Sequence, residues 1–301
     1  MRVKGWVTMA GRAWRRESPR SRGFTLIEIM VALLLGLVVL GGVAQVFIST
    51  RQAVRIQQAS SRMQENGRNA IALLARYIRM SGYSTFPWDK GQTNWSPTNG
   101  ERGYPASPSN NPFAQGQVAR GIGATESGNI NGVDSIRIRY PGAADNMITT
   151  CLGRVVPVNE MADITLSLTA NDPVEGRSLQ CTDNNTSPIP QPLVAGLQDM
   201  RIWYAVSQDP AGGGSGMDAV GRLTGATAYL PADQVTARGL WNRVIGVQIS
   251  LLVRSDENNV ASQPQTYRFP ITNSVATTPS AGDQRLRQVV GTTITVRNQA
   301  N

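Results

Sequence analysis

The chain has 301 residues, of which 41% are hydrophobic, and 29 lysine or arginine residues stand against 20 aspartate or glutamate residues. This length is enough for a membrane anchor and one domain with a real hydrophobic core. The chain contains no histidine, which excludes Ser–His and Cys–His catalysis and an imidazole metal site. The composition does not exclude catalysis by a pair of carboxylates. We nevertheless expect that the protein is not an enzyme and that it has neither a metal nor a cofactor site.

Residues 1–23 form a basic leader in front of an apolar segment, residues 24–48. The leader carries seven basic residues and one acid, so +6 of the net charge of +9 lies there and +3 remains for the rest. From Ile29 to Ile48 the one polar side chain is Gln45. At about 1.5 Å per residue, a helix of this length crosses a hydrocarbon core of roughly 30 Å. The basic leader predicts a cytoplasmic side, with everything after Ile48 outside the cytoplasm.

An ordinary secretory signal peptide is the alternative interpretation of this start. Such signals are cut behind the apolar region, at a site resembling A-x-A. Residues 41–44, Gly-Gly-Val-Ala, offer small side chains but no good match. The apolar run also continues into a helical pattern, which favours an anchor that stays attached.

Residues 49–82 predict a continuation of the helix with one apolar face. Apolar residues recur at spacings of three, four and seven, at Ile56, Ala59, Met63, Ala70 and Leu74. Gly67 is an interior glycine and weakens the prediction locally. Gly82 predicts a helix end at Ser81 and Gly82. A continuous helix from Phe24 to Ser81 would be about 87 Å long.

Two stretches predict irregular structure. Residues 83–117 are rich in proline and glycine and contain Trp88 and Trp95, which we expect to fix a long loop to its own domain, a contact surface being the alternative. Residues 209–218 contain a glycine run with an acid at each end. They lack the alternating oxygen ligands of a calcium loop, so we expect a flexible hairpin loop.

Residues 118–301 predict a sheet domain, because apolar and polar residues alternate in several short runs. In chain order these runs are 136–140, 164–168, 200–206, 247–253, 267–271 and 294–296. Pro270 predicts that the run at 267–271 is an edge strand. Half-buried strands covered by the amphipathic helix predict an α+β fold, with an antiparallel sheet.

Cys151 and Cys181 are the two cysteines of the chain and lie 30 positions apart. Outside the cytoplasm two such thiols are expected to form one disulfide, while two buried free thiols are the alternative.

Residues 23–28, Gly-Phe-Thr-Leu-Ile-Glu, resemble the processing site of type IV prepilins. The resemblance implies that a membrane-bound prepilin peptidase cuts after Gly23 and N-methylates Phe24, the new first residue. It also implies that Glu28 meets the charged amine of a neighbouring subunit during assembly. A lone carboxylate within packed apolar helices requires a cationic partner, so the physical expectation is the same.

Later segments are similar to the PilW-type minor pilins. They are residues 74–83, 193–200, 203–204, 241–244, 251–255 and 293–298, and the two cysteines also fall where this family often has them. The chain departs from the family at Tyr77, where an acid is common. The resemblance implies a pilin-like fold, inner-membrane anchoring, a periplasmic domain, and a place at the pilus tip. Its implied partners are other minor pilins, the major pilin and a large tip adhesin, with which it primes pilus assembly.

Two other functions compete with this interpretation. The first is the equivalent minor pseudopilin of a type II secretion system, which has the same anchor and helix–sheet plan. The second is an adhesion or DNA-uptake module, in which Arg137, Arg139 and Arg154 would bind phosphate. A net charge of +3 after the leader is a weak electrostatic footprint, so nucleic acid is not an expected partner.

Overall fold

The structure is a computed structural model, and it describes most of the helix and sheet regions of the chain. The described residues are 23–82, 113, 117, 119–123, 132–143, 145, 147–157, 160–173, 175–185, 187–207, 225–226, 228–270 and 275–296. Trp88, Trp95 and the glycine-rich residues 209–218 lie outside them. The chain divides into two compact units, Met1–Arg51 and Gln52–Asn301, which we describe separately.

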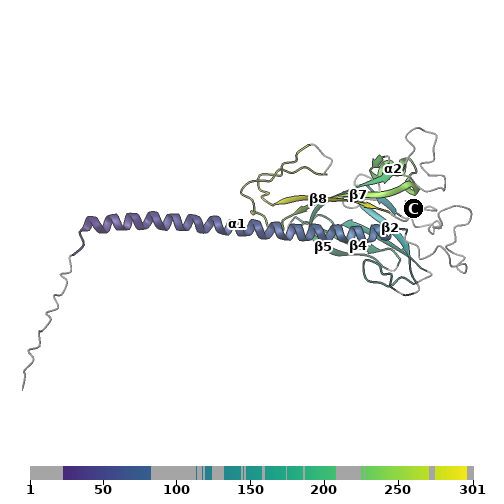
Figure 1. Cartoon of the computed structure of the whole chain (residues 1–301), viewed down its shortest axis with the longest axis horizontal. Coiled ribbons are helices and arrows are strands. Elements are labelled where there is room, and N and C mark those ends of the chain that lie inside the picture. The colour runs from purple at the N-terminus through teal and green to yellow at the C-terminus, as the bar shows by residue number, and fades with distance from the viewer. Residues whose placement is uncertain are drawn as a thin grey trace, which may run out of the picture. The chain divides into compact units, whose positions relative to one another are not determined.

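Helix α1 (Leu26–Met80) begins in the first unit and ends in the second. In the first unit its side chains are all exposed. In the second, one face is buried, at Met63, Gly67, Ala70, Leu74, Ala75, Tyr77 and Ile78, and Figure 1 shows this part running along the sheet. The predicted amphipathic helix is therefore confirmed, but its buried face begins later than expected, since Ile56 is still 37% exposed.

The end of α1 is set by a glycine and tied to the sheet. Gly82 has φ +70°, a left-handed conformation that glycine adopts without a steric penalty. Its N–H donates to the carbonyl oxygen of Arg139 at 3.1 Å. The predicted end at Ser81 and Gly82 is confirmed, and the chain leaves the helix already bonded to strand β2 (Ser135–Pro141).

The sheet contains eight antiparallel strands in the order β1-β2-β3-β4-β5-β7-β8, with β6 paired to β5. The strands are β1 (Ala119–Ile122), β2 (Ser135–Pro141), β3 (Met161–Leu168), β4 (Arg177–Asp183), β5 (Ser187–Val206), β6 (Ala228–Leu230), β7 (Val244–Arg254) and β8 (Arg287–Thr295). A short helix, α2 (Ala232–Ala237), and one 3-10 turn (Trp241–Arg243) precede β7.

Strand β5 connects the two halves of the sheet. Its 20 residues pair with β4 over the first half and with β7 over the second, where β6 also pairs with it. The core joins α1 to these strands through fully buried side chains such as Leu74, Leu166, Met200 and Ile249. The helix and the sheet thus share one hydrophobic core, as an α+β fold requires.

Most predicted strands are present, and the exceptions have physical causes. Alternating runs correspond to β2, β3, β7 and parts of β5 and β8. The predicted edge strand at 267–271 is wrong over its described residues: Tyr267 forms one isolated bridge with Thr277, and Pro270 has no N–H to donate. Residue 271 lies outside the description. Strand β7 is buried at ten of its eleven positions, so both of its faces are covered instead of one.

Gly67 lies where α1 comes closest to the sheet. A Cβ atom at this position would lie 3.2 Å from Val290 Cγ2 on β8 and 3.3 Å from Val253 Cγ2 on β7. Both distances are shorter than ordinary van der Waals contact. The glycine that weakened the helix prediction is therefore a packing position, because its missing side chain allows the helix to contact two strands.

A larger side chain at Gly67 tests this packing. We expect Gly67→Leu to lower the free energy of unfolding by about 1–3 kcal/mol, because the added atoms overpack the contact with Val253 and Val290. The matched control is Asn69→Leu, which places the same side chain on the exposed face of α1. Denaturant unfolding of the full chain in detergent measures both. Equal stabilities of the two variants would contradict a close helix–sheet contact at Gly67.

Candidate functional site

The start of α1 is a capped helix end that follows an exposed segment. Glu28 N–H donates to the side-chain oxygen of Thr25 at 3.3 Å and to its carbonyl oxygen at 3.1 Å. Thr25 therefore acts as the N-cap, three residues before an acid, which is the spacing of a capping box. This role of Thr25 was not predicted, although the Thr-x-x-Glu spacing signals it.

The cap places Glu28 in the first turn of α1. A negative charge at this end of a helix is favoured by the helix dipole, typically by about 0.3–1 kcal/mol at exposed positions. The Glu28 carboxylate therefore stabilises the start of its own helix, independently of any contact with another subunit. Its distance from Phe24 is four residues along the chain, so both belong to the same end of the anchor.

The bond between Gly23 and Phe24 lies outside the helix and is accessible. Gly23 is exposed, and Phe24 is 76% exposed. A Cβ atom at Gly23 would meet nothing within 4 Å. The described residues therefore leave room for a side chain at position 23.

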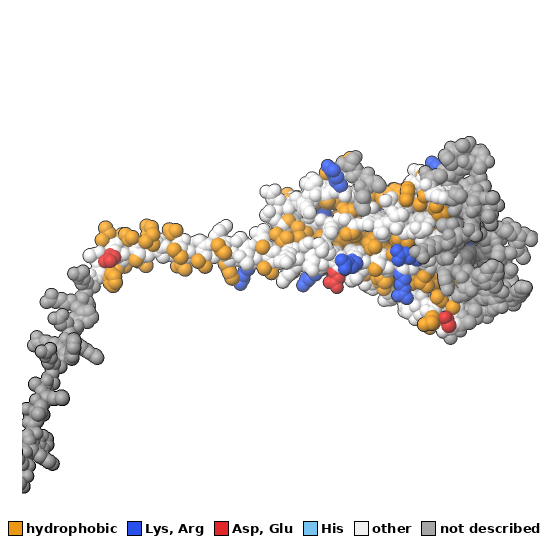
Figure 2. Space-filling model, viewed as in Figure 1, with side chains coloured by type: hydrophobic (Ala, Val, Ile, Leu, Met, Phe, Trp, Pro, Cys, Tyr) orange, Lys and Arg blue, Asp and Glu red, His pale blue; other side chains and the backbone are white. Residues whose placement is uncertain are grey.

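The first part of α1 has an apolar surface on all sides. It contains a window of 18 residues with mean hydropathy 2.6, none of whose residues is buried. Figure 2 shows hydrophobic side chains along the visible face of this part of the helix. Among the described residues, α1 is the helix that is long and apolar enough to cross a membrane. Such a surface is stable in lipid or against other apolar helices, and unstable in water.

A second cluster ties the end of α1 to the cysteine pair. The structure joins Cys151 to Cys181 on β4, with Cα atoms 6.2 Å apart. Tyr77 on α1 donates to the carbonyl oxygen of Thr150 at 3.5 Å, and Tyr140 on β2 donates to that of Thr149 at 3.0 Å. Tyr77, where the family often has an acid, is buried here and contacts this loop through its hydroxyl group.

Arg154 links the same loop to β4 through charge. Its guanidinium donates to Asp183 at 2.7 Å and to Glu160 at 2.6 Å. Burial raises the pKa of Asp183, but hydrogen bonds from Arg154 and from the N–H of Asn185 outweigh it, and the pKa is lowered overall. Burial also raises the pKa of Tyr140, and the nearby Tyr77 and Asp183 add to this effect. No local motif predicted this network, in which Arg154 and Asp183 lie 29 residues apart.

The arginines considered for phosphate binding are already engaged. Arg137 pairs with Asp163 at 2.6 Å, and Arg154 pairs as described above. Arg139 is buried and donates to the carbonyl oxygen of Gln117 at 2.5 Å. Phosphate contacts of DNA-binding proteins require basic groups that face solvent. These three side chains therefore do not form a nucleic-acid surface.

Two sequence profiles match the chain. The profile of the prokaryotic N-terminal methylation motif matches residues 18–44, which contain the cap and the first part of α1. The profile of type IV pilus-assembly protein W matches residues 168–298, which contain β4 to β8. Both matches agree with the resemblance found in the sequence: residues 18–44 are similar to the methylation motif and residues 168–298 to the PilW family.

Structural comparison finds a similar chain among solved proteins. A type IV-like pilin from Thermus thermophilus has 12% sequence identity and a TM-score of 0.40, over 79% of this chain and 98% of that one. A search of curated proteins finds no significant match.

The ion pair between Arg154 and Asp183 predicts a pH-dependent stability. We expect Arg154→Gln to lower the free energy of unfolding by about 2–3 kcal/mol at pH 7, because Asp183 stays ionised and buried without its partner. Since the folded pKa of Asp183 lies below its unfolded value, the pair stabilises the fold above about pH 4 and loses this effect as the pH falls further. The difference between wild type and variant should therefore shrink at pH 3.

Denaturant unfolding at pH 7 and pH 3, followed by circular dichroism, measures this difference. The matched control is Arg238→Gln, which removes an exposed arginine that contacts Gln234. A destabilisation of Arg154→Gln that is equally large at both pH values would contradict the role of the Asp183 charge.

Proposed function

We propose that this chain, which is similar to the PilW family over residues 168–298, is a minor pilin of that type and helps prime the assembly of type IV pili. In this proposal it belongs to an inner-membrane complex with other minor pilins, and it sits at the pilus tip after assembly. The observation that carries the proposal is the start of α1, an accessible Gly23–Phe24 bond followed by a capped, fully exposed apolar helix.

The exposed helix supports a two-stage mechanism. The apolar surface first stores the subunit in the bilayer, with the second unit on the periplasmic side. Extraction then exchanges lipid contacts for contacts with the apolar helices of other subunits, and helices in such environments associate through packing and polar contacts. An anchor that is apolar all round suits both stages, because no side of it depends on the rest of the chain for cover.

Glu28 provides the specificity of this exchange. Within a bundle of apolar helices a single carboxylate is costly unless it is paired with a cation. Peptidase cleavage after Gly23 creates such a cation, the methylated amine of Phe24, on each processed subunit. Pairing between Glu28 of one subunit and the amine of its neighbour would set the axial register of the helices.

The partners that we propose for the second unit are proteins and not nucleic acid. Its arginines at 137, 139 and 154 are bonded to groups of the same chain. A disulfide between Cys151 and Cys181 fits an oxidising compartment such as the periplasm. The match to the pilus-assembly profile favours the pilus over a type II secretion system. The proposed partners are the prepilin peptidase, the major pilin, other minor pilins and a tip adhesin.

Processing by the peptidase is the first test. We expect protein recovered from the membranes of its host to begin at an N-methylated Phe24, and protein from a host without prepilin peptidase to keep residues 1–23. Intact mass and N-terminal sequencing measure both. A start beyond Ala44 would indicate an ordinary exported protein, and an uncut chain in both hosts would indicate a plain membrane anchor. Either result would overturn the proposal.

The role of Glu28 is tested by its removal. We expect Glu28→Ala to remain in the membrane and to be processed, but to fall at least tenfold in sheared pilus fractions, because the neighbour's amine loses its counter-charge. The control is Glu65→Ala, which removes an exposed acid from the second unit. Quantitative immunoblots of membrane and pilus fractions measure the distribution. Normal entry of the Glu28 variant into pili would exclude this pairing.

A further inference from the structure

Strand β8 forms one border of the sheet. It pairs with β7 along its whole length, from Arg287 opposite Arg254 to Thr295 opposite Gly246. Figure 1 shows the two strands side by side. In the described part of the chain, no strand lies on the other side of β8. The strand therefore has an outer edge of nine residues, and this edge belongs wholly to the second unit.

The register with β7 fixes which backbone groups of β8 point to this edge. In an antiparallel pair, residues whose N–H and C=O groups face the neighbouring strand alternate with residues whose groups face away. At the two ends of the pair, Ser255 N–H donates to the carbonyl oxygen of Leu286, and Val296 N–H donates to that of Ile245. Even-numbered residues therefore face β7, and the odd-numbered residues from 287 to 295 present their N–H and C=O groups to the outer edge.

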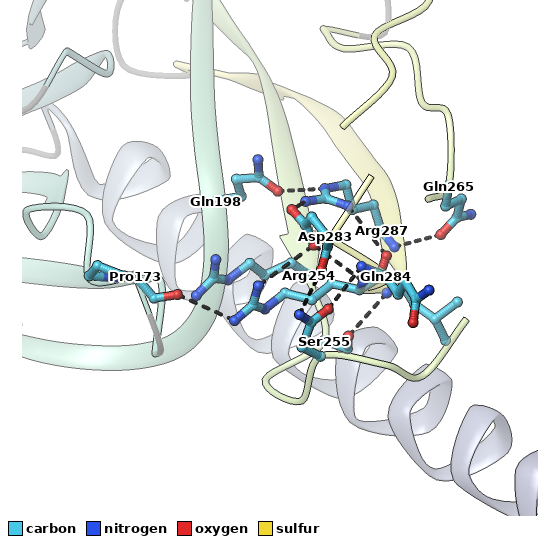
Figure 3. Close-up of polar contacts among 12 residues, drawn as sticks. Pro173, Gln198, Arg254, Ser255, Gln265, Asp283, Gln284 and Arg287 are labelled. Atoms are coloured by element: carbon cyan, nitrogen blue, oxygen red, sulfur yellow. Dashed lines mark hydrogen bonds and ion pairs between the residues drawn. The ribbon is translucent and has the colours of Figure 1, made fainter. Parts of the chain in front are cut away.

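A side chain already occupies the first of these outer positions. Arg287 N–H donates to the side-chain oxygen of Gln265 at 2.7 Å, as Figure 3 shows. The amide oxygen of Gln265 thus lies where a carbonyl oxygen of a neighbouring strand would lie. Beyond this point, no described residue bonds to the outer backbone groups of Val289, Gly291, Thr293 and Thr295. The last three of these residues are exposed, so their N–H and C=O groups are accessible to another chain.

Other edges of the sheet have features that hinder pairing with another chain, and β8 does not. Strand β1 has four residues and β6 has three. Strand β5 pairs with β7 from Leu197 onward, and its earlier part contains Pro190 and Pro192, which have no N–H. Short strands, prolines and charged side chains are the usual protection of sheet edges. Residues 288–295 of β8 contain neither a proline nor a charged side chain.

We propose that the outer edge of β8 binds an extended, uncharged segment of another protein, which joins the sheet as a further strand. An extended backbone presents N–H and C=O groups at the same alternating spacing, so it can bond to residues 289–295 through main-chain groups. An uncharged segment fits because the edge offers no counter-charge for a charged one. Val290, which is half-buried and packs against the core beside Gly67, provides an apolar neighbour for the segment on the α1 side. This inference does not depend on the proposed function.

Binding of a labelled peptide to the full chain in detergent, followed by fluorescence anisotropy, tests the edge. The probe is a peptide of alternating threonine and valine with capped ends. It is N-methylated at every valine, so that one edge can form hydrogen bonds and the peptide cannot stack on itself. We expect it to bind with a dissociation constant below about 1 mM. The matched control is the same peptide N-methylated at every residue, which should bind at least tenfold more weakly because it has no N–H to donate.

Two substitutions of one threonine separate the backbone from the side chain. Thr293→Pro removes one outward N–H without removing a bond to β7, and it should weaken binding of the probe at least tenfold. Thr293→Val keeps this N–H and should bind like the wild type. Should Thr293→Pro fail to fold, as judged by circular dichroism, Thr295→Pro provides the same comparison at the end of the strand.

Three results would overturn the proposal. The first is no binding of the probe up to about 1 mM. The second is equal affinity for the probe and the fully methylated peptide, or equal affinity of the wild type and the proline variants. The third is a dimer of the wild-type chain that Thr293→Pro abolishes in analytical ultracentrifugation, because a second copy of the chain would then occupy the edge.

Discussion

The packing of α1 against the sheet is the interaction on which the rest of this structure depends. From Met63 onward one face of the helix enters the hydrophobic core, and Gly67 brings it against β7 and β8. Before that point the helix is exposed, apart from Ala59 and Ser60, which are half-buried. A single helix thus has an exposed apolar part and a part with one buried face. The sheet, whose two halves β5 connects, provides the surface against which that second part packs.

The sequence predicted those parts of the fold whose signal is periodic and local. Strands β2 and β3 alternate cleanly, and α1 shows helical spacing over many turns. Strand β4 was missed because its buried positions are Leu179, Cys181 and Asp183, and an acid hides the alternation. The run at 267–271 misled because Tyr267 and Phe269 have the spacing of a strand, whereas its described residues form an isolated bridge, between Tyr267 and Thr277, and no strand. Pairing between distant segments, which decides such cases, is not encoded in any short window.

The two candidate sites also differ in how far the sequence could predict them. The processing segment is a contiguous motif, so Gly23, Phe24 and Glu28 could be named from the sequence, and their roles remain predictions. The network of Arg154, Glu160 and Asp183 could not be foreseen, because Arg154 and Asp183 lie 29 residues apart and are brought together by the fold. An arginine looks like ordinary surface charge in a sequence until its burial and its partners are known.

The connection at the end of α1 has a mechanical consequence for a fibre subunit. Tension along the helix would reach β2 through the bond between Gly82 and Arg139, and the loop at Thr150 through Tyr77. The disulfide between Cys151 and Cys181 adds a covalent bond from this loop to β4, so the loop that Tyr77 contacts is tied to the sheet. With the cysteines reduced, only non-covalent contacts would hold the loop around Thr150 to the sheet, and tension would break its hydrogen bonds one after another. The redox state of one cysteine pair would then set how much force the joint between helix and sheet can bear.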